Sequence, residues 1–558
     1  MSGRTESQLR KLERIARRYD GMGETKQTLL RRLARGAFAR PKDLLLYHEI
    51  LCFLSAYPDD PRVLAEVEAC LEAFSARGDL RRLRSRLADT GLAGTDTRYS
   101  FYWATACWLA ERWPERITID WEDFEGEAQF ERILPLLVPF CETPALDSLA
   151  FSAREWLERL KGGETDAAFL VRRVAAMPGD DFTRESFYHE LNLTLKLSPG
   201  PGTPSRTHAR LPGSRIYHQT RSLRRERPSL REEIQRPPLA VREVSPRRAE
   251  RIIDLARESM VTRSRDLDAF MYADPADVRL VDCGEGLSFA CLGMRPERRL
   301  MLEAVYGFLT LKNGVPIGYL LISSLFGCSE IAFNVFDSFR GAEAGAIFGR
   351  VMGTARWLFG SDAFTIDPYQ LGHGNAEGRE SGAWWFYYKF GFRPEDPSVR
   401  RLVRAELRRM EGDPAYRSSP EKLEALSAAP MFFYGDGRRP DTLPGISLGN
   451  IGLAISGLLA DRFGAEREDG LAACAKECAR LLGLRSLRSL TTGERLAWER
   501  WSPLALSLAG LSRWPESDKK LLRQIMLAKG GRRESDYVAL FNRHARLRRA
   551  LLKLAGMP

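Results

Sequence analysis

The sequence predicts a mixed α/β central domain, with a mainly antiparallel sheet and flanking helices, between all-α N- and C-terminal regions. Three observations lead to this fold class. Apolar residues recur at three- and four-residue spacing over 7–197, which is the period of an amphipathic helix. Strand-like apolar runs then alternate with helical patterns over 239–395. Beyond that stretch the helical spacing returns, so 396–558 is predicted to be mainly α-helical.

The length of the chain indicates how many domains to expect, and its charge indicates what kind of partner it could bind. A single hydrophobic core stops growing at roughly 250–300 residues, so a chain of 558 residues is expected to hold several domains. Lys and Arg number 85 against 74 Asp and Glu, a net charge of +11. Residues 203–250 alone hold twelve Arg and five Glu. Guanidinium groups suit phosphate oxygens, and a merely solvated basic surface is the alternative.

The N-terminal region, 1–197, is predicted to be all-α, and 42–57 and 98–113 show the plainest helical patterns. The stretch SPGPGTPS at 198–205 ends this pattern, because proline removes a backbone donor and glycine favours turns. A Pro-, Gly- and Arg-rich linker over 198–238 is therefore expected to precede the central domain.

The cysteines and the apolar stretches of the sequence indicate the cellular compartment in which the protein is expected to be found. Nine cysteines are scattered along the chain without a Cys-x-x-Cys pair, which suits a reducing environment better than a disulfide framework. No histidine lies near Cys474 and Cys478, so no metal site is expected. The N-terminus lacks the apolar run of a signal peptide, and the longest apolar stretch, around 446–460, is too short to cross a bilayer. We predict a cytoplasmic protein without a membrane span.

The central domain, 239–395, is expected to begin with a strand at 239–244. Ser245-Pro246 then marks a helix start, a hydroxyl N-cap followed by proline at the first helical position. Two apolar runs within 303–326 flank Asn313-Gly314, the pair that accepts the positive φ angles of a tight hairpin. With a third run, three consecutive antiparallel strands are expected. The other elements are a short helix (266–272), the third strand (330–336), a Gly-rich turn with a helix (337–359), a strand (363–367) and a helix (382–390).

Two motifs in this domain carry a family resemblance. One is Arg340-Gly341-Ala342-Glu343-Ala344-Gly345, and the other is Ala383-x-x-x-Tyr387-x-x-x-Gly391-Phe392. With the hairpin at 312–319 and the order of the elements, they resemble the acyl-CoA loop and the late helix of the GNAT superfamily of acyltransferases. Glu343 stands where that family usually has glycine, and Glu380 stands where it usually has asparagine.

The resemblance implies a division of labour among the residues. Acetyl-CoA or another acyl-CoA would be the co-substrate and an amine of unknown identity the acceptor, with no metal. Tyr387 would protonate the departing thiolate, and Glu330 is the candidate base for the amine. Donor binding would fall to Phe333 and Val335 in the third strand and to Arg340, Gly341, Ala342, Ala344, Gly345 and Ala346 in the Gly-rich turn.

Acceptor recognition is assigned to one Gly-flanked loop, because four polar side chains crowd it: Gln370, His373, Asn375 and Glu377. Two alternatives to the acyl-CoA-dependent enzyme stay open. The donor could be a carrier protein or an aminoacyl-tRNA, either of which would suit polyanion contact through the Arg-rich linker (203–250) and a basic C-terminal helix (537–554). The domain could instead be a catalytically degenerate recognition or scaffold protein, since a fold alone does not establish activity.

Overall fold

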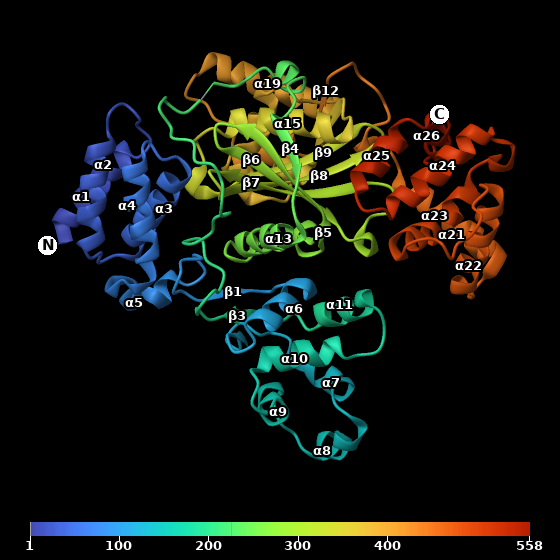
Figure 1. Ribbon diagram of the computed structural model, residues 1–558, viewed down its shortest axis with the longest axis horizontal. Coiled ribbons are helices and arrows are strands. Elements are labelled where there is room, and N and C mark those ends of the chain that lie inside the picture. Colours follow the sequence, from blue (N-terminus) through green and yellow to red (C-terminus); the bar gives the residue numbers. More distant parts are fainter. Residues whose placement is uncertain (1, 225, 558) are drawn as a thin grey trace. The chain divides into compact units, whose positions relative to one another are not determined.

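The structure, a computed structural model, describes residues 2–224 and 226–557. The chain divides into two compact units (Figure 1). The first unit comprises Met1–Leu223, Glu250–Tyr272 and Lys312–Pro316, and the second comprises Arg224–Ala249, Ala273–Leu311 and Ile317–Pro558. No helix in the described ranges combines the length and the apolar character needed to cross a bilayer.

The first unit is mostly helical, and several of its helices follow a capping residue. Asp60, for example, accepts hydrogen bonds from the N–H groups of Arg62 and Val63 ahead of Pro61, which satisfies donors that the helix itself leaves unpaired. The helices are α1 (Ser2–Ile15), α2 (Gly23–Arg35), α3 (Pro41–Ala56), α4 (Pro61–Glu72), α5 (Gly78–Leu83), α6 (Trp103–Arg112), α7 (Glu127–Leu137), α8 (Thr143–Ser148), α9 (Ala153–Leu160), α10 (Asp166–Ala175), α11 (Asp181–Glu190), most of α13 (Pro246–Val261), and α14 (Asp268–Met271).

The prediction of an all-α N-terminal region is wrong in one respect. Three short strands, β1 (Thr97–Tyr99), β2 (Ile117–Ile119) and β3 (Leu195–Leu197), form an antiparallel sheet in the order β1-β3-β2. The expected helix at 98–113 is therefore β1 followed by α6. Strands of three residues are too short to show an alternating pattern, and β3 comes from far along the chain.

The second unit is built on a nine-stranded sheet in the order β11-β12-β10-β9-β8-β7-β6-β5-β4. Strands β4 to β9, which are consecutive in the sequence, are also neighbours in the sheet. Asn313 and Gly314, with φ angles of 52° and 79°, form the predicted hairpin turn. The strands are β4 (Ala240–Glu243), β5 (Ala273–Gly284), β6 (Leu287–Met294), β7 (Ala304–Lys312), β8 (Val315–Leu325), β9 (Cys328–Val335), β10 (Ala363–Ile366), β11 (Arg393–Pro394) and β12 (Met431–Tyr434).

The sheet is larger than the sequence predicts. The three antiparallel strands expected over 303–336 are present as β7, β8 and β9. Two further strands, β5 and β6, precede them, and β12 joins the sheet from within the region predicted to be helical. Charged residues such as Asp277 and Arg279 interrupt the apolar pattern of β5, although both are buried. The structure is thus mixed α/β, with a mostly antiparallel sheet.

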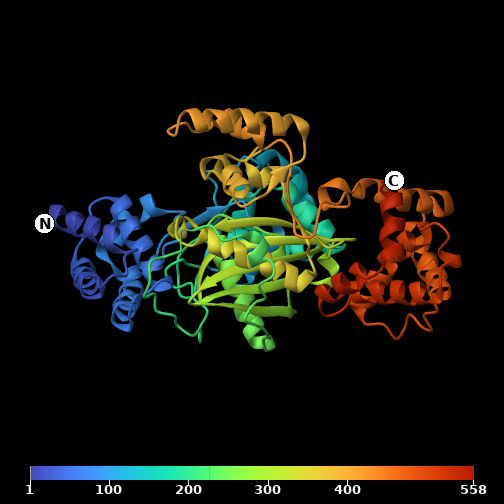
Figure 2. The ribbon, with the colours of Figure 1, turned by 90° about the horizontal axis from the view of Figure 1, so that it is seen from above.

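Helices of the second unit lie against the sheet and beyond it. Phe348 of α15 contacts Phe333 of β9 with ring centroids 5.5 Å apart, and α21–α26 gather into a bundle at one end of the sheet (Figures 1 and 2). The helices are α12 (Leu230–Glu233), α15 (Ala344–Phe359), α16 (Pro368–Leu371), α17 (Ala376–Glu380), α18 (Ala383–Lys389), α19 (Pro397–Gly412), α20 (Pro420–Leu426), α21 (Leu448–Phe463), α22 (Arg467–Leu481), α23 (Thr492–Ser507), α24 (Glu516–Lys529), α25 (Glu534–Asn542) and α26 (Ala545–Leu554).

The basic C-terminal helix predicted over 537–554 is in fact two helices, α25 and α26. His544 separates them, because its side chain accepts a hydrogen bond from the N–H of Leu547 and so starts α26. Part of its basic character is neutralised within the unit: Arg546 pairs with Asp518 at 2.5 Å, and Arg548 pairs with Asp441.

A buried ionic cluster ties the C-terminal helices to the sheet. Lys529 Nζ donates to Glu534 Oε1 at 2.6 Å. The main-chain N–H of Glu534 donates to Asp277 of β5 at 3.1 Å, and Asp277 also accepts from the Tyr306 hydroxyl at 2.6 Å. Burial raises the pKa values of Asp277 and Glu534 and lowers that of Lys529. The cluster therefore stabilises the unit only while every member keeps its partner.

Candidate functional site

Strands β9 and β10 form a fork. They run parallel and pair only through Cys328, Ser329 and Glu330 of β9. Strand β9 continues to Val335, and its opposite edge is paired with β8 along its whole length. No strand in the described ranges pairs with the β10-facing edge of 331–335. An extended chain could therefore pair with this edge, because backbone N–H and C=O groups require partners.

Tyr387 lies inside the fork. Helix α18 carries it, and its ring packs against Phe348 of α15 and Phe392, with centroids 5.4 and 5.9 Å away. The side chain is 2% exposed. Burial raises the pKa of the hydroxyl, while a hydrogen bond with the Phe333 backbone opposes the shift. Tyr387 consequently keeps its proton at neutral pH, as a general acid must.

Glu330 lies where the fork begins. It pairs with Thr365 in the last rung shared by β9 and β10. Burial, reinforced by the neighbouring carboxylates of Asp367 and Glu303, raises the pKa of Glu330 from 4.5 to about 7. Side chains alternate along a strand, so Glu330 and Phe333 project from opposite faces of β9. A carboxylate with this pKa can accept a proton near neutral pH.

The Gly-rich turn follows β9 and leads into α15, which begins at Ala344. Gly341 has a φ of 73°, a conformation that glycine adopts without strain. Arg340 fixes the turn by donating to the Val335 carbonyl oxygen at 3.3 Å and by pairing with Asp337 and Glu377 at 2.9 and 2.6 Å. The guanidinium group of this predicted donor-binding residue is thus engaged by carboxylates.

Arg224 and residues 226–237 lie along α15. The main-chain N–H of Arg224 donates to Glu343 Oε1 at 3.4 Å, and Glu343 is 6% exposed. A Cβ added at Gly345 would lie 3.8 Å from the Glu226 carbonyl oxygen and 3.0 Å from the Phe390 ring. The segment therefore borders the helix N-terminus where Ala344, Gly345 and Ala346 are predicted to bind the donor.

Glycines let this segment approach closely. A Cβ at Gly349 would lie 2.9 Å from the Glu233 side chain, and one at Gly353 would lie 2.6 Å from the Glu233 carbonyl oxygen. Arg350 donates to the carbonyl oxygens of Arg236 and Pro237 at 3.2 and 2.9 Å. Gly345, Gly349 and Gly353 thus form a stripe with a spacing of four residues. This signal is present in the sequence, but only Gly345 was interpreted there, as part of the acyl-CoA loop.

The four predicted acceptor-binding residues lie together around α16 and α17, but three of them have partners. His373 Nδ1 lies 3.1 Å from Glu424, and Glu377 pairs with Arg340. Asn375 caps α17 by accepting from the Gly378 N–H at 3.1 Å and donates to the Tyr369 carbonyl oxygen at 3.0 Å. Gln370 is exposed. The sequence did not reveal Glu424, which comes from α20 and organises this loop.

Two donor-binding predictions concern side chains that pack rather than face a ligand. Phe333 stacks on Phe386 of α18, with centroids 6.4 Å apart, and Ala342 is buried. The Phe333 main chain remains in the fork, where it is hydrogen-bonded to the Tyr387 hydroxyl. Within the ranges that the structure describes, no group of three or more His, Cys, Asp or Glu side chains is arranged to hold a metal ion.

None of the protein-family models, curated proteins or solved structures compared with this chain matches it. A function for the chain must therefore be inferred from the chemistry of the fork itself.

Proposed function

We propose that the second unit is an N-acyltransferase with a GNAT fold, which transfers an acyl group, acetyl in the simplest case, from an acyl-CoA to an amine. One observation carries the proposal. Within the described ranges no strand pairs with the β10-facing edge of β9 beyond Glu330, and the Tyr387 hydroxyl is hydrogen-bonded to the Phe333 backbone inside the resulting fork. The pantetheine arm of an acyl-CoA is extended and could pair with this edge as an added strand does.

The two titratable groups at the fork suit opposite halves of an acyl transfer. Glu330 would take a proton from the amine as its nitrogen forms a bond to the thioester carbon. A main-chain N–H of β9 would stabilise the negative charge that develops on the carbonyl oxygen. Tyr387 would give its proton to the sulfur as the C–S bond breaks. Exchange with solvent then restores both groups, and no covalent enzyme intermediate is needed.

The donor's phosphates would lie at the N-terminus of α15. There the N–H groups of Ala344, Gly345 and Ala346 belong to the first turn, which has no intrahelical acceptors. The Glu343 carboxylate opposes a phosphate at this position, and it holds the Arg224 N–H. Binding of an acyl-CoA in this manner therefore requires Arg224 to move away from Glu343.

A catalytically degenerate recognition protein is the second candidate, and the covered turn at Glu343 favours it. The variant with a carrier-protein or aminoacyl-tRNA donor has less support from the Arg-rich stretch, because Arg206 and Arg210 pair with Glu49 and Glu68 within the first unit. The full chain titrated calorimetrically with acetyl-CoA and with CoA separates the candidates. Micromolar binding supports the enzyme, whereas no heat at millimolar ligand rejects an acyl-CoA donor.

The pH dependence of the activity then tests whether Glu330 is the general base. We expect kcat/KM for release of CoA, measured with a panel of small amines and lysine peptides, to rise with pH through about 7, the pKa of Glu330. Glu330→Gln should remove this rise and lower the rate about 100-fold or more. The exposed Glu380→Gln variant is the control. A wild-type pH profile retained by Glu330→Gln would exclude Glu330 as the base.

A further inference from the structure

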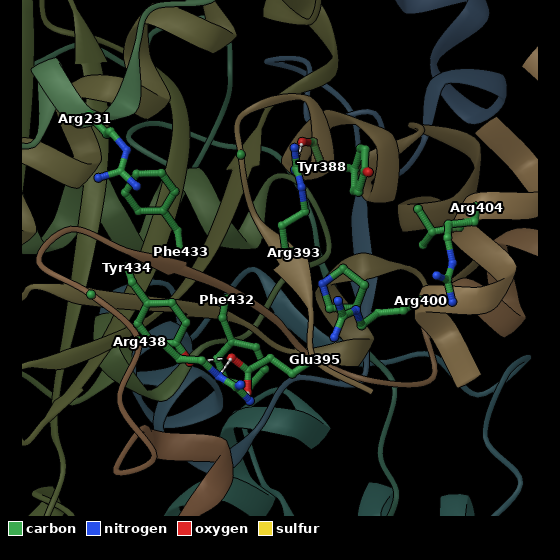
Figure 3. A pocket seen from close by; sticks show the side chains of 14 residues that line it. Arg231, Tyr388, Arg393, Glu395, Arg400, Arg404, Phe432, Phe433, Tyr434 and Arg438 are labelled. Carbon is green, nitrogen blue, oxygen red and sulfur yellow. Dashed lines mark hydrogen bonds and ion pairs between the residues drawn. The ribbon is translucent and has the colours of Figure 1, made fainter. Parts of the chain in front are cut away.

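A second concave site lies in the same unit, away from the opening of the fork. A cavity of about 600 Å³ is bordered by β11, β12, the end of α18, the first turns of α19 and α12 (Figure 3). Tyr434 in its wall pairs with Ala363 at the start of β10, whereas the fork opens at the other end of that strand. The volume lies within the roughly 300–1,000 Å³ that is usual for small-molecule sites.

The cavity is strongly basic. Its lining includes five guanidinium groups and one carboxylate: Arg231, Arg393, Arg400, Arg404, Arg438 and Glu395. The carboxylate is already used, since Glu395 binds Arg438 through two contacts of 2.8 Å and accepts from the Tyr434 hydroxyl at 3.0 Å. Four positive charges therefore remain without a compensating carboxylate in the lining.

Two of these arginines are held close together at a cost. Arg400 and Arg404 are four residues apart on α19, so they share a face of the helix and repel each other. Neither side chain makes a hydrogen bond or an ion pair with another residue in the described parts of the chain. An anion bound between them would relieve this repulsion and could accept two parallel hydrogen bonds from each planar guanidinium group.

The remaining wall is aromatic. Phe432 and Tyr434 project from the same face of β12, with ring planes 1° apart and centroids 6.1 Å apart. The Arg393 guanidinium carbon lies 4.0 Å from the centroid of the Tyr388 ring. Its hydrogen bonds to the chain use only Nη1, which leaves its other nitrogens available. A flat ring can stack on such surfaces at little entropic cost.

We propose that this cavity, the β12 arginine pocket, binds a nucleotide, either free or as the end of a nucleic acid chain. The arginines would hold the phosphate groups, and Phe432 and Tyr434 would receive the base. Neither half of the site suffices for this assignment: the arginines alone suit any polyanion, and the aromatic rings alone suit any apolar molecule. The inference does not depend on acyl transfer at the fork.

Titration calorimetry on the full chain tests the proposal with ADP, adenosine and tripolyphosphate as probes. ADP should bind at least tenfold more tightly than adenosine, which lacks phosphate, and than tripolyphosphate, which lacks a ring. Its affinity should fall as salt is raised. A 5′-phosphorylated trinucleotide that binds more tightly than ADP would indicate a nucleic acid end as the source. Tripolyphosphate that binds as tightly as ADP, or no binding of ADP at millimolar concentration, overturns the proposal.

Matched variants locate the binding. Arg400→Ala/Arg404→Ala should weaken ADP binding at least tenfold. Arg401→Ala/Arg408→Ala removes the same charge from positions of the same helix that do not line the pocket, and it should change the affinity less than twofold. If both double variants weakened ADP binding equally, the binding would depend on the general basic charge of the helix and the assignment to this pocket would be overturned. Arg400→Ala/Arg404→Ala should keep the wild-type rate of CoA release from acetyl-CoA, so failure at the fork and failure at this pocket are distinguishable.

Discussion

Glu330 and Thr365 form the last rung that joins β9 to β10, and the two strands separate immediately beyond them. Three carboxylates gather near this point, because Asp367 and Glu303 both act on Glu330. Such a concentration of like charge at a half-buried position opposes folding, and proteins tolerate it mainly where a perturbed pKa serves function. Glu330 therefore offers a test of the site that needs no substrate.

The first prediction concerns stability and pH. The pKa of Glu330 is about 7 in the folded chain and near 4.5 when unfolded, so the native state binds the extra proton between these values. The contribution of this group to the free energy of unfolding then falls as pH rises from about 4.5 through 7. Glu330→Gln should stabilise the protein by about 2 kcal/mol at pH 8, after allowance for partial exposure, and by much less at pH 5. Urea denaturation at both values measures the difference, and equal effects at the two pH values would contradict the shifted pKa.

The second prediction isolates the Tyr387 hydroxyl. Tyr387→Phe should lower turnover tenfold to a thousandfold with little change in donor affinity, because the hydroxyl acts on the leaving sulfur and not on the bound ground state. Tyr388→Phe is the matched control on the same helix, since the ring that stacks on Trp384 is kept. Single-turnover kinetics and calorimetry give the two quantities. An unaltered rate would remove Tyr387 from the mechanism.

The third prediction concerns the packing of 226–237 on α15. Gly353→Ala places a Cβ 2.6 Å from the Glu233 carbonyl oxygen, so the backbone must shift, at a cost of about 1–3 kcal/mol. Gly457→Ala in α21 meets no atom within 4 Å and should stabilise its helix by about 0.5–1 kcal/mol. Thermal unfolding compares them. Faster tryptic cleavage within 221–236 of the Gly353 variant alone would follow from the same displacement.

The fourth prediction concerns the buried ionic cluster. Lys529→Met leaves the Glu534 carboxylate buried without its nearest cation and should cost about 3–5 kcal/mol. Adding Glu534→Gln removes the unpaired charge, so the double variant should recover a large part of this loss. Denaturant titration of the two single variants and the double variant yields the coupling energy. If the losses of stability in the two single variants simply added up in the double variant, the interaction between Lys529 and Glu534 would contribute nothing to stability.

The elements of the central region that carry local signals could be predicted. The hairpin required an Asn-Gly turn with two positive φ angles, and Asn313-Gly314 supplies it. Ser245-Pro246 correctly marked the start of α13, and the apolar alternation of 330–336 corresponds to β9. Each signal lies within a few residues of the feature that it specifies, which is why sequence alone sufficed.

Features that depend on distant partners could not be predicted. Strand β12 is four residues long and follows helical patterning, and its pairing with β10 and β11 makes it a strand. The raised pKa of Glu330 depends first on its burial in the folded unit and then on Asp367 and Glu303, which come from other parts of the chain. The β12 arginine pocket likewise draws Arg231 and Arg400 from positions far apart in sequence. The composition shows an excess of basic residues, but it does not show which arginines meet in the folded chain.

The packing of 226–237 against α15 has a practical consequence for dissecting this protein. A fragment cut at residue 239, where the sheet-forming sequence begins, would leave the glycine stripe of α15 bare and deprive Arg350 of its acceptors at Arg236 and Pro237. Such a truncation would lose activity or precipitate for reasons unrelated to chemistry at the fork. Any recombinant fragment of the second unit should therefore begin at or before residue 224.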